Sequence, residues 1–457
     1  MALRDEANTR EEDRRSRLDR FLRPFGDVRA REGVSALALA GTLFLLLTAY
    51  YLLKVIREPL ILLWGGAEVK SYAAAGQALL LLPVLRAHGA LAARVGRVPL
   101  IVTVLLFVTS NLLVFAALLR AHVAVGLAFY LWVGTFNYLL VATFWSFAND
   151  VYTPEQGKRL FAIVGVGSSL GALSGAAFAG WLLKHLAPPH LMLVAAAMLT
   201  AAVVPFLWVD RWQHRQTANS GVARIGSEPL TGAGGFKALV EDRYLLLIAV
   251  LTLLTNWVTN SGEYLLDKTL IEVARSGAEH IADPQRFVGQ FKATYFWWVN
   301  LLGVVGQLFV VSRALKHLGI GGSLLALPLV AMLGASSMLL FPTLWVIRTA
   351  KTAEKSVDYS LETTAVNALY LGVSRDAKYK AKAVIDTFVV RAGDICAAAS
   401  VWIGVHQGIR RTGFAASNVL LTAIWFGVAL RIRAMHRART DRAGAAMNPG
   451  AVPAATA

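Results

Sequence analysis

A chain of 457 residues with 56% hydrophobic and only 16% charged side chains is too apolar for a soluble protein and suits a polytopic membrane protein. The net charge of +17 could suggest a nucleic-acid partner, but Lys and Arg gather in the N-terminal arm, the C-terminal tail and alternate loops. This positive-inside distribution argues against nucleic acid and predicts that both termini are cytoplasmic.

Residues 1–33 form a charged arm without an apolar core, so we expect no cleavable signal peptide and a polar or interfacial helix. Apolar runs of near-membrane length follow, and residues 210–243 interrupt them with the polar, Gly-rich and basic composition of a cytoplasmic linker. The runs begin near Val34, Ser71, Val98, Val123, Leu160 and Leu191 before the linker, and near Tyr244, Gln290, Gly321, Leu344, Ala381 and Ala416 after it.

The predicted fold is all-α, with about twelve transmembrane helices in two six-helix halves, residues 34–209 and 244–435, and a cytoplasmic tail at 436–457. This arrangement is that of the major facilitator superfamily. Internal symmetry supports duplication, because NDVY at Asn149–Tyr152 and NALY at Asn367–Tyr370 each close the fourth helix of a half. We therefore predict a monomeric, multi-pass protein of the cell (inner) membrane.

The stretch Trp345–Asp394 places charges where lipid is expected. An ion at bilayer depth costs several kcal/mol unless it faces a partner or a wet cavity, so such charges indicate function. Because two antiparallel helices rise about 1.5 Å per residue, Lys355 should lie level with Asp394, and we predict this pair, with Asp358 as a competitor. The charges on the first helix share one face and are Arg348, Lys351, Lys355, Asp358 and Glu362; those on the second are Asp386, Arg391 and Asp394. Glu362 should lie nearer Asp386. The alternative is that all these ions only neutralise one another.

The first helix carries three charged residues where it leaves the membrane, namely Lys54, Arg57 and Glu58. They could attract an anion, or form an outer gate with charges on the seventh helix; snorkelling to the interface is the alternative. The seventh-helix charges are Glu263, Asp267 and Lys268. Lys292 is interpreted as an interfacial charge, with binding as the alternative.

Asn149 closes the fourth helix and is a candidate for lining a cavity. The following helix has Gly167, Gly171 and Gly175 at every fourth position, which predicts a smooth stripe for close helix packing.

No motif for catalysis is present: there is no HExxH, no Walker lysine motif and no G-x-S-x-G elbow. Cys396 is the single cysteine and the histidines form no ligand-spaced group. We therefore predict no enzyme activity, no cofactor and no metal.

The segments FWSFANDVYTPEQGKRLFAIVGVGSSLG and YSLETTAVNALYLGVSRDAKYKAKAVIDTFVVRAGD resemble the nucleotide transporter family of plastids and intracellular bacteria, the non-mitochondrial ADP/ATP translocases. The resemblance implies a fold like the major facilitator superfamily and exchange of ATP for ADP. KVIRE at 54–58 is similar to the family's charged first-helix motif. The chain departs from the family where Val366 and Asn367 replace a Lys-Glu pair and Asp394 replaces a lysine. Those losses remove cations from a site for a polyphosphate.

The leading hypothesis is a secondary transporter of nucleotides or related phosphorylated anions that works by alternating access. The candidate substrate-binding residues are Lys54, Arg57, Asn149, Arg348, Lys351, Lys355 and Arg391. The candidate gating or ion-pair residues are Glu58, Glu263, Asp267, Asp358, Glu362, Asp386 and Asp394. The alternative is a proton-coupled transporter of an unrelated small solute, in which Glu362, Asp386 or Asp394 takes up the proton. A third hypothesis is a transport-inactive membrane scaffold.

Overall fold

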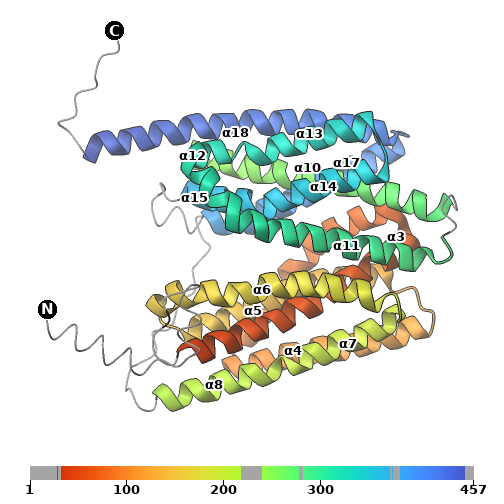
Figure 1. Ribbon diagram of the computed structural model, residues 1–457, viewed down its shortest axis with the longest axis vertical. Helices are drawn as coiled ribbons and strands as arrows, with labels where there is room; N and C mark the ends of the chain where they lie inside the picture. The colour runs from red at the N-terminus through yellow and green to blue at the C-terminus, as the bar shows by residue number, and fades with distance from the viewer. Residues whose placement is uncertain are drawn as a thin grey trace, which may run out of the picture. The chain divides into compact units, whose positions relative to one another are not determined.

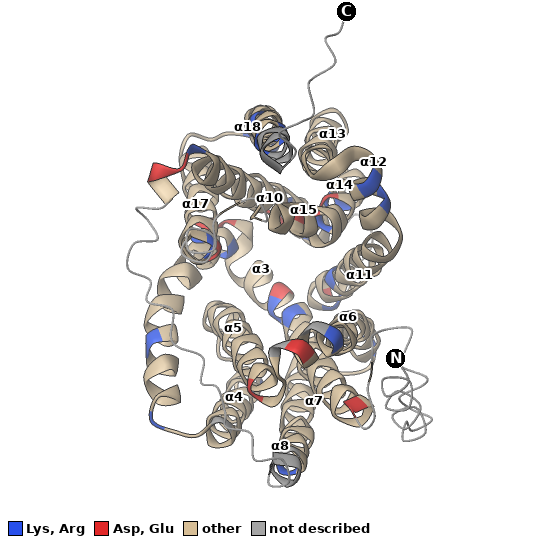
Figure 2. Ribbon diagram, turned by 90° about the vertical axis from the view of Figure 1, so that its left-hand side faces the viewer, with Lys and Arg blue, Asp and Glu red and all other residues tan. Residues whose placement is uncertain are grey.

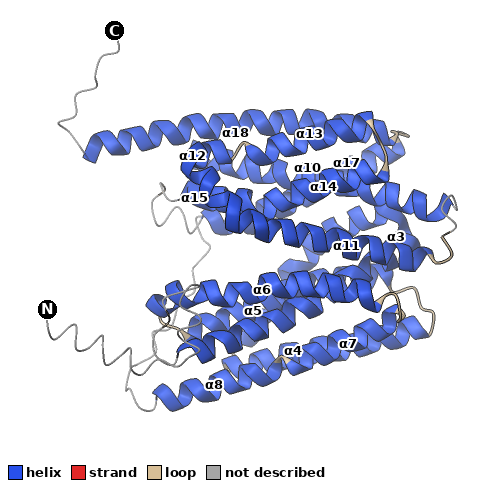
Figure 3. Cartoon of the chain, in the orientation of Figure 1, coloured by secondary structure: helices blue, strands red, loops and turns tan. Residues whose placement is uncertain are grey.

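The computed structural model describes residues 28, 32–217, 239–276, 281–370, 373 and 381–447. Throughout these ranges the secondary structure is helical, without a β-strand (Figure 3). Nearly all of the predicted N-terminal arm, the middle of the predicted linker and the end of the predicted tail lie outside the described residues.

Before the linker, α3 bends at Gly66, whose φ of 79° is in the left-handed region that glycine adopts without steric cost. The bend divides this long helix into two membrane-length segments. The helices are α3 (Glu32–Ala92), α4 (Arg97–Arg120), α5 (Gly126–Val151), α6 (Pro154–Leu182), α7 (Pro188–Ala201) and α8 (Val203–Thr217).

After the linker, three π-helical segments interrupt α-helices without breaking them. The elements are α10 (Arg243–Ser276), α11 (Pro284–Val305), η1 (Gly306–Val310), α12 (Val311–Ser323), α13 (Ala326–Leu340), α14 (Leu344–Val357), η2 (Asp358–Glu362), α15 (Thr363–Leu369), η4 (Ile385–Val389), α17 (Val390–His406) and α18 (Arg411–Met447). The helix through α14, η2 and α15 is thus continuous, and α18 extends beyond the predicted start of the tail.

The all-α membrane fold predicted from composition is confirmed. Over the described ranges, nine helical stretches are long and apolar enough to cross a membrane, one of them being the whole of bent α3. Several predicted starts agree closely with observed ones: Val98 with Arg97, Tyr244 with Arg243, and Leu344 with the first residue of α14. The exact number of spans stays a prediction.

The chain divides into two compact units. Unit 1 comprises Met1–Gly65, Leu79–Ser227 and Ala282–Trp297, and unit 2 comprises Gly66–Ala78, Glu228–Ile281 and Trp298–Ala457. The unit boundaries therefore differ from a simple division at the linker, because Gly66–Ala78, directly after the bend, belongs to unit 2 and the start of α11 belongs to unit 1.

Unit 1 is held together at the predicted glycine stripe of α6. A Cβ atom built on Gly167, Gly171 or Gly175 would lie 2.1, 2.6 and 2.6 Å from carbonyl oxygens of α3. The hydroxyl of Thr48 on α3 also donates to the Gly171 carbonyl at 3.3 Å. The two backbones approach so closely because no side chain separates them, which confirms the packing interpretation of the stripe.

Unit 2 is built around α10, which packs against α14, α17 and α18 (Figure 1). Its apolar core includes the large side chains of Tyr244 and Trp425, which are 1% and 0% exposed. Tyr244 donates a hydrogen bond to the Leu369 carbonyl at 3.3 Å. α10 therefore connects the helices that carry the predicted charged stretch.

Candidate anion site and charge network

In unit 1, the first part of α3 and the start of α11 bring together a buried group of charges (Figure 2). Glu58 lies at the centre and is 1% exposed. Its carboxylate is 3.4 Å from the Nε of Arg57 and 3.4 Å from the Nζ of Lys292. Charges this well buried are stable only with partners, so Glu58 holds two cations inside the unit.

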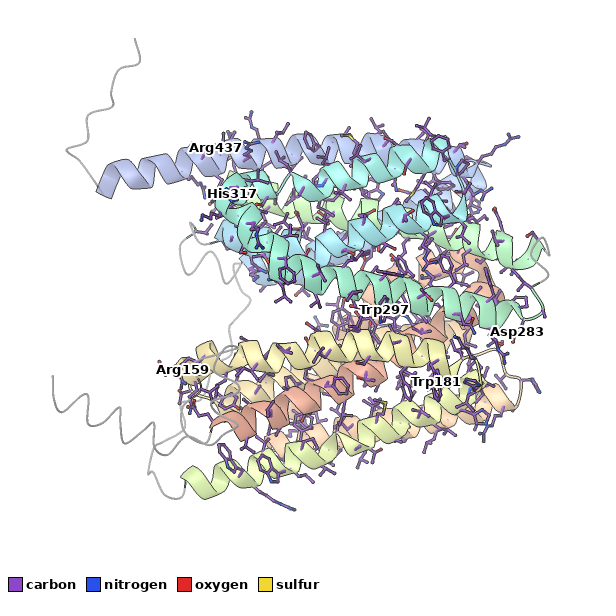
Figure 4. All side chains as sticks on the ribbon, viewed as in Figure 1. Arg159, Trp181, Asp283, Trp297, His317 and Arg437 are labelled. Atoms are coloured by element: carbon purple, nitrogen blue, oxygen red, sulfur yellow. The ribbon has the colours of Figure 1, made fainter. Side chains whose placement is uncertain are left out.

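Aromatic rings enclose the cations of this group. The ammonium of Lys54 lies 4.3 Å from the ring centre of Phe296 and 5.0 Å from that of Tyr51. Phe296 directly precedes, in the sequence, the residue Trp297 that is labelled in Figure 4. The guanidinium of Arg57 lies 4.5 Å from the ring centre of Tyr130 on α5. Ring faces stabilise cations without neutralising them.

We name Lys54, Arg57, Glu58 and Lys292 the unit 1 cation cluster. Three cations stand against one carboxylate, and Lys54 is only half-buried. An anion with several phosphate oxygens is favoured where positive charge is in surplus. The cluster therefore has the charge and the partial access that a phosphorylated ligand requires.

The position of Lys292 in the structure differs from the one expected from the sequence. Lys292 was interpreted as an interfacial charge, but its side chain is 0% exposed and lies beside Glu58. Little in the sequence indicates this contact, because Glu58 already has Arg57 beside it on the first helix.

Asn149 does not join the cluster. It is exposed near the C-terminal end of α5, whereas the contact with Arg57 is made by Tyr130 near the start of that helix. At 1.5 Å per residue the two positions are about 28 Å apart along the axis. The predicted contact of Asn149 with substrate therefore stays a prediction, at a place away from the cluster.

In unit 2, Lys351 of α14 is fully buried. Its Nζ donates to Glu354 at 2.7 Å and to the Thr259 carbonyl at 3.0 Å, and the Thr259 hydroxyl donates to Glu354 at 2.9 Å. Gly262 on α10 makes the room, because a Cβ there would lie 3.0 Å from this Nζ. The geometry favours a structural ion pair for Lys351 over the predicted contact with substrate.

The predicted direct pair of Lys355 with Asp394 was wrong. Lys355 pairs at 3.7 Å with Asp358 on its own helix, the competitor considered from sequence. Asp394 accepts from Arg391 at 2.7 Å and from Asn260 at 2.7 Å. Partners three residues apart on one helix are already adjacent. Residues at the same height on two neighbouring helices can still hold their side chains too far apart for contact.

We name Lys351, Glu354, Lys355, Asp358, Arg391 and Asp394 the unit 2 charge network. Its three cations each pair with a carboxylate, so it has no surplus charge. Arg348 and Glu263 are half-buried nearby on α14 and α10. A balanced network of this kind is better suited to changing partners than to holding a polyanion.

Glu362 and Asp386, which were expected at a similar level, differ in exposure. Asp386 is exposed on η4, while Glu362 is 3% exposed at the end of η2. Across the described ranges, neither carboxylate oxygen of Glu362 has a hydrogen-bond partner.

The acidic and basic residues expected to form an outer gate with the first helix have other partners. Asp267 accepts from Lys70 at 2.6 Å, and Lys268 pairs with Glu68. Both partners lie just after the Gly66 bend, in the segment that belongs to unit 2. Glu68 and Lys70 were not predicted from the sequence. Their charges directly after Gly66, the glycine at which α3 bends, could have indicated them as partners.

No group of three or more His, Cys, Asp or Glu side chains is suitably placed for a metal ion within the described ranges.

Comparison with solved structures defines the class of fold. The chain resembles an auto-inhibited POT family peptide transporter (TM-score 0.62, 14% identity, 89% of this chain and 97% of the other). It also resembles the nucleoside transporter NupG (TM-score 0.59, 12% identity, 89% and 99%) and a bacterial homologue of the iron transporter ferroportin in an inward-facing state (TM-score 0.61, 10% identity, 88% and 98%). The fold is therefore the one that these solved transporters share.

Among curated proteins, the chain is distantly similar to ADP,ATP carrier protein 1 of Chlamydia pneumoniae, with 23% identity over 297 residues, 56% of this chain and 55% of the carrier. ADP,ATP carrier protein 1 of Chlamydia trachomatis serovar D gives 23% over 293 residues. The chain spans about half the length of the curated relatives it matches. No family model matches the chain. In sequence the chain is thus distantly similar to ADP,ATP carriers, and in fold it resembles solved transporters.

Proposed function

We propose that this chain is a secondary transporter that exchanges nucleotides, or closely related phosphorylated anions, across a membrane by alternating access. The observation that carries the proposal is the unit 1 cation cluster, in which two cations contact the buried carboxylate of Glu58 and a third, Lys54, lies against aromatic rings. The distant similarity to ADP,ATP carriers supports the nucleotide as substrate. We propose further a monomer in the cell (inner) membrane with both termini cytoplasmic.

Within the cluster we assign different roles to the cations. Lys54 is half-buried and reaches the substrate phosphates. Arg57 and Lys292 are held by Glu58 and supply the positive field behind it. The rings of Tyr51 and Phe296 around Lys54 keep its ammonium in place while the site is empty.

The unit 2 charge network serves a second role. Each of its cations has a carboxylate partner, so these pairs stabilise the helices in one arrangement and change partners in another. This division assigns recognition to unit 1 and switching to unit 2.

The experiment that tests the proposal is uptake of radiolabelled ATP into proteoliposomes preloaded with ADP or with buffer alone. We expect uptake that requires internal ADP and that falls at least about tenfold in Lys54→Gln, since a hydrogen bond between charged groups contributes roughly 1.5–3 kcal/mol. Lys184→Gln, at an exposed lysine of unit 1 outside the spans, is the matched control. No ATP uptake by folded wild-type protein, or equal uptake by Lys54→Gln, would contradict the proposal.

A further inference from the structure

Glu362 is a buried carboxyl group that the roles above do not use. It is 3% exposed, and neither Oε1 nor Oε2 has a hydrogen-bond partner over the part of the chain that the structure describes. Ala365 and Val366, three and four residues further on, lie on the same side of the helix. The first belongs to the apolar core of unit 2 and the second packs against it.

Among the described elements that pack closely against η2, none pairs a basic side chain with Glu362. The elements that pack against η2 are η1, α12, α13, α14 and α15, and η1, α13 and α15 contain no ionisable side chain. On α12 the ionisable residues are exposed: Arg313, Lys316 and His317. On α14 Arg348 lies about 21 Å away along the axis.

The nearer charges of α14 and η2 are already paired. Lys351 binds Glu354 and Lys355 binds Asp358. A carboxylate buried without a partner is so unfavourable that the group takes up a proton instead.

We propose that Glu362 is a proton-binding site, which carries a proton in this conformation and exchanges it with water when η2 rearranges during transport. The transferred species is the proton alone: water on one side gives it up, the Glu362 carboxyl carries it, and water on the other side receives it.

The local helix geometry supplies the movement. η2 is a π-helical segment in which the Thr363 hydroxyl donates to the Asp358 carbonyl at 2.8 Å, and such segments often mark functional hinges. It packs on a second one, η1, where a Cβ on Gly306 would lie 2.8 Å from the Ser360 hydroxyl. Conversion of η2 to regular α-helix would rotate the helix after η2 relative to the helix before it by about 100° about the helix axis. This rotation would move Glu362 out of its apolar position.

The transport part of this inference rests on the proposed exchange. ATP carries one more negative charge than ADP when both are fully ionised, so a proton that accompanies ATP would offset the difference.

The first test needs no substrate. Infrared spectra of purified wild type and Glu362→Gln are compared at about pH 7, with Asp283→Asn as the control because Asp283 is exposed and begins α11, where Asn caps equally well. We expect a protonated-carboxyl band in the wild type and the control that is missing in Glu362→Gln. Identical spectra for all three proteins would overturn the proposal. It would also be overturned if added sodium ions removed the protonated-carboxyl band of the wild type.

The second test follows protons with a pH-sensitive dye trapped in proteoliposomes during ATP/ADP exchange. We expect proton movement with the wild type and with Asp283→Asn, and exchange without proton movement with Glu362→Gln. Proton movement that persists in Glu362→Gln would contradict the inference. If the wild type exchanges no nucleotide, the proposed function fails, while the infrared result still decides the proton site.

Discussion

The ion pair of Lys70 and Asp267 gives a prediction whose size follows from the structure. The two side chains are 10% and 2% exposed, and Nζ lies 2.6 Å from Oδ2. Removing either partner leaves a buried charge without its counter-ion, which costs about 3–5 kcal/mol. Lys70→Ala and Asp267→Ala should each destabilise the protein by an amount in this range.

The double variant separates pairing from simple loss of contacts. Lys70→Ala combined with Asp267→Ala removes both charges, so we expect it to be less destabilised than the sum of the single variants by well over 1 kcal/mol. The charge-swapped protein, Lys70→Asp with Asp267→Lys, should recover part of the stability for the same reason. The assay is unfolding of the detergent-solubilised protein with increasing denaturant.

The pair of Arg286 and Asp283 is the matched control. Its atoms are 3.8 Å apart and both side chains are more than half exposed, so removing it should change stability by less than about 1 kcal/mol. Equal effects at the buried and the exposed pair, or strict additivity at Lys70 and Asp267, would refute the reasoning.

Two further predictions concern packing and partner choice. Gly171→Leu should lower the yield of folded protein in size-exclusion chromatography, because a side chain there meets a carbonyl oxygen of α3. Gly165→Ala should be tolerated, because nothing lies within 4 Å of the added Cβ. Equal yields of the two variants would argue against close packing along the glycine stripe. In double-mutant cycles on stability, the coupling free energy between Lys355→Ala and Asp358→Ala should be roughly 0.5–1 kcal/mol. The coupling between Lys355→Ala and Asp394→Ala should be smaller. A larger coupling with Asp394 would instead support the pair of Lys355 with Asp394 across the two helices.

Hydropathy predicted the helices well because membrane spans need long apolar runs. The glycine stripe of α6 was also predictable, since residues four apart on a helix share a face whatever the fold. Both inferences depend only on local geometry along the chain.

The partners of buried charges were harder to predict. The rise per residue fixed the level of Lys355 relative to Asp394, but the rotation of each helix about its axis, which decides contact, is set by packing. Lys292 and Lys70 were missed as buried partners because their carboxylates lie far away in sequence, at Glu58 and Asp267.

The central claim is that the unit 1 cation cluster binds the phosphates of the substrate. The most direct measurement is equilibrium binding of ATP, ADP and adenosine to purified wild type and Lys54→Gln in detergent. We predict that ATP and ADP bind, that adenosine binds much more weakly, and that Lys54→Gln weakens ATP at least about tenfold without changing adenosine. Adenosine binding as tight as ATP binding, or unchanged ATP affinity in Lys54→Gln, would contradict the account.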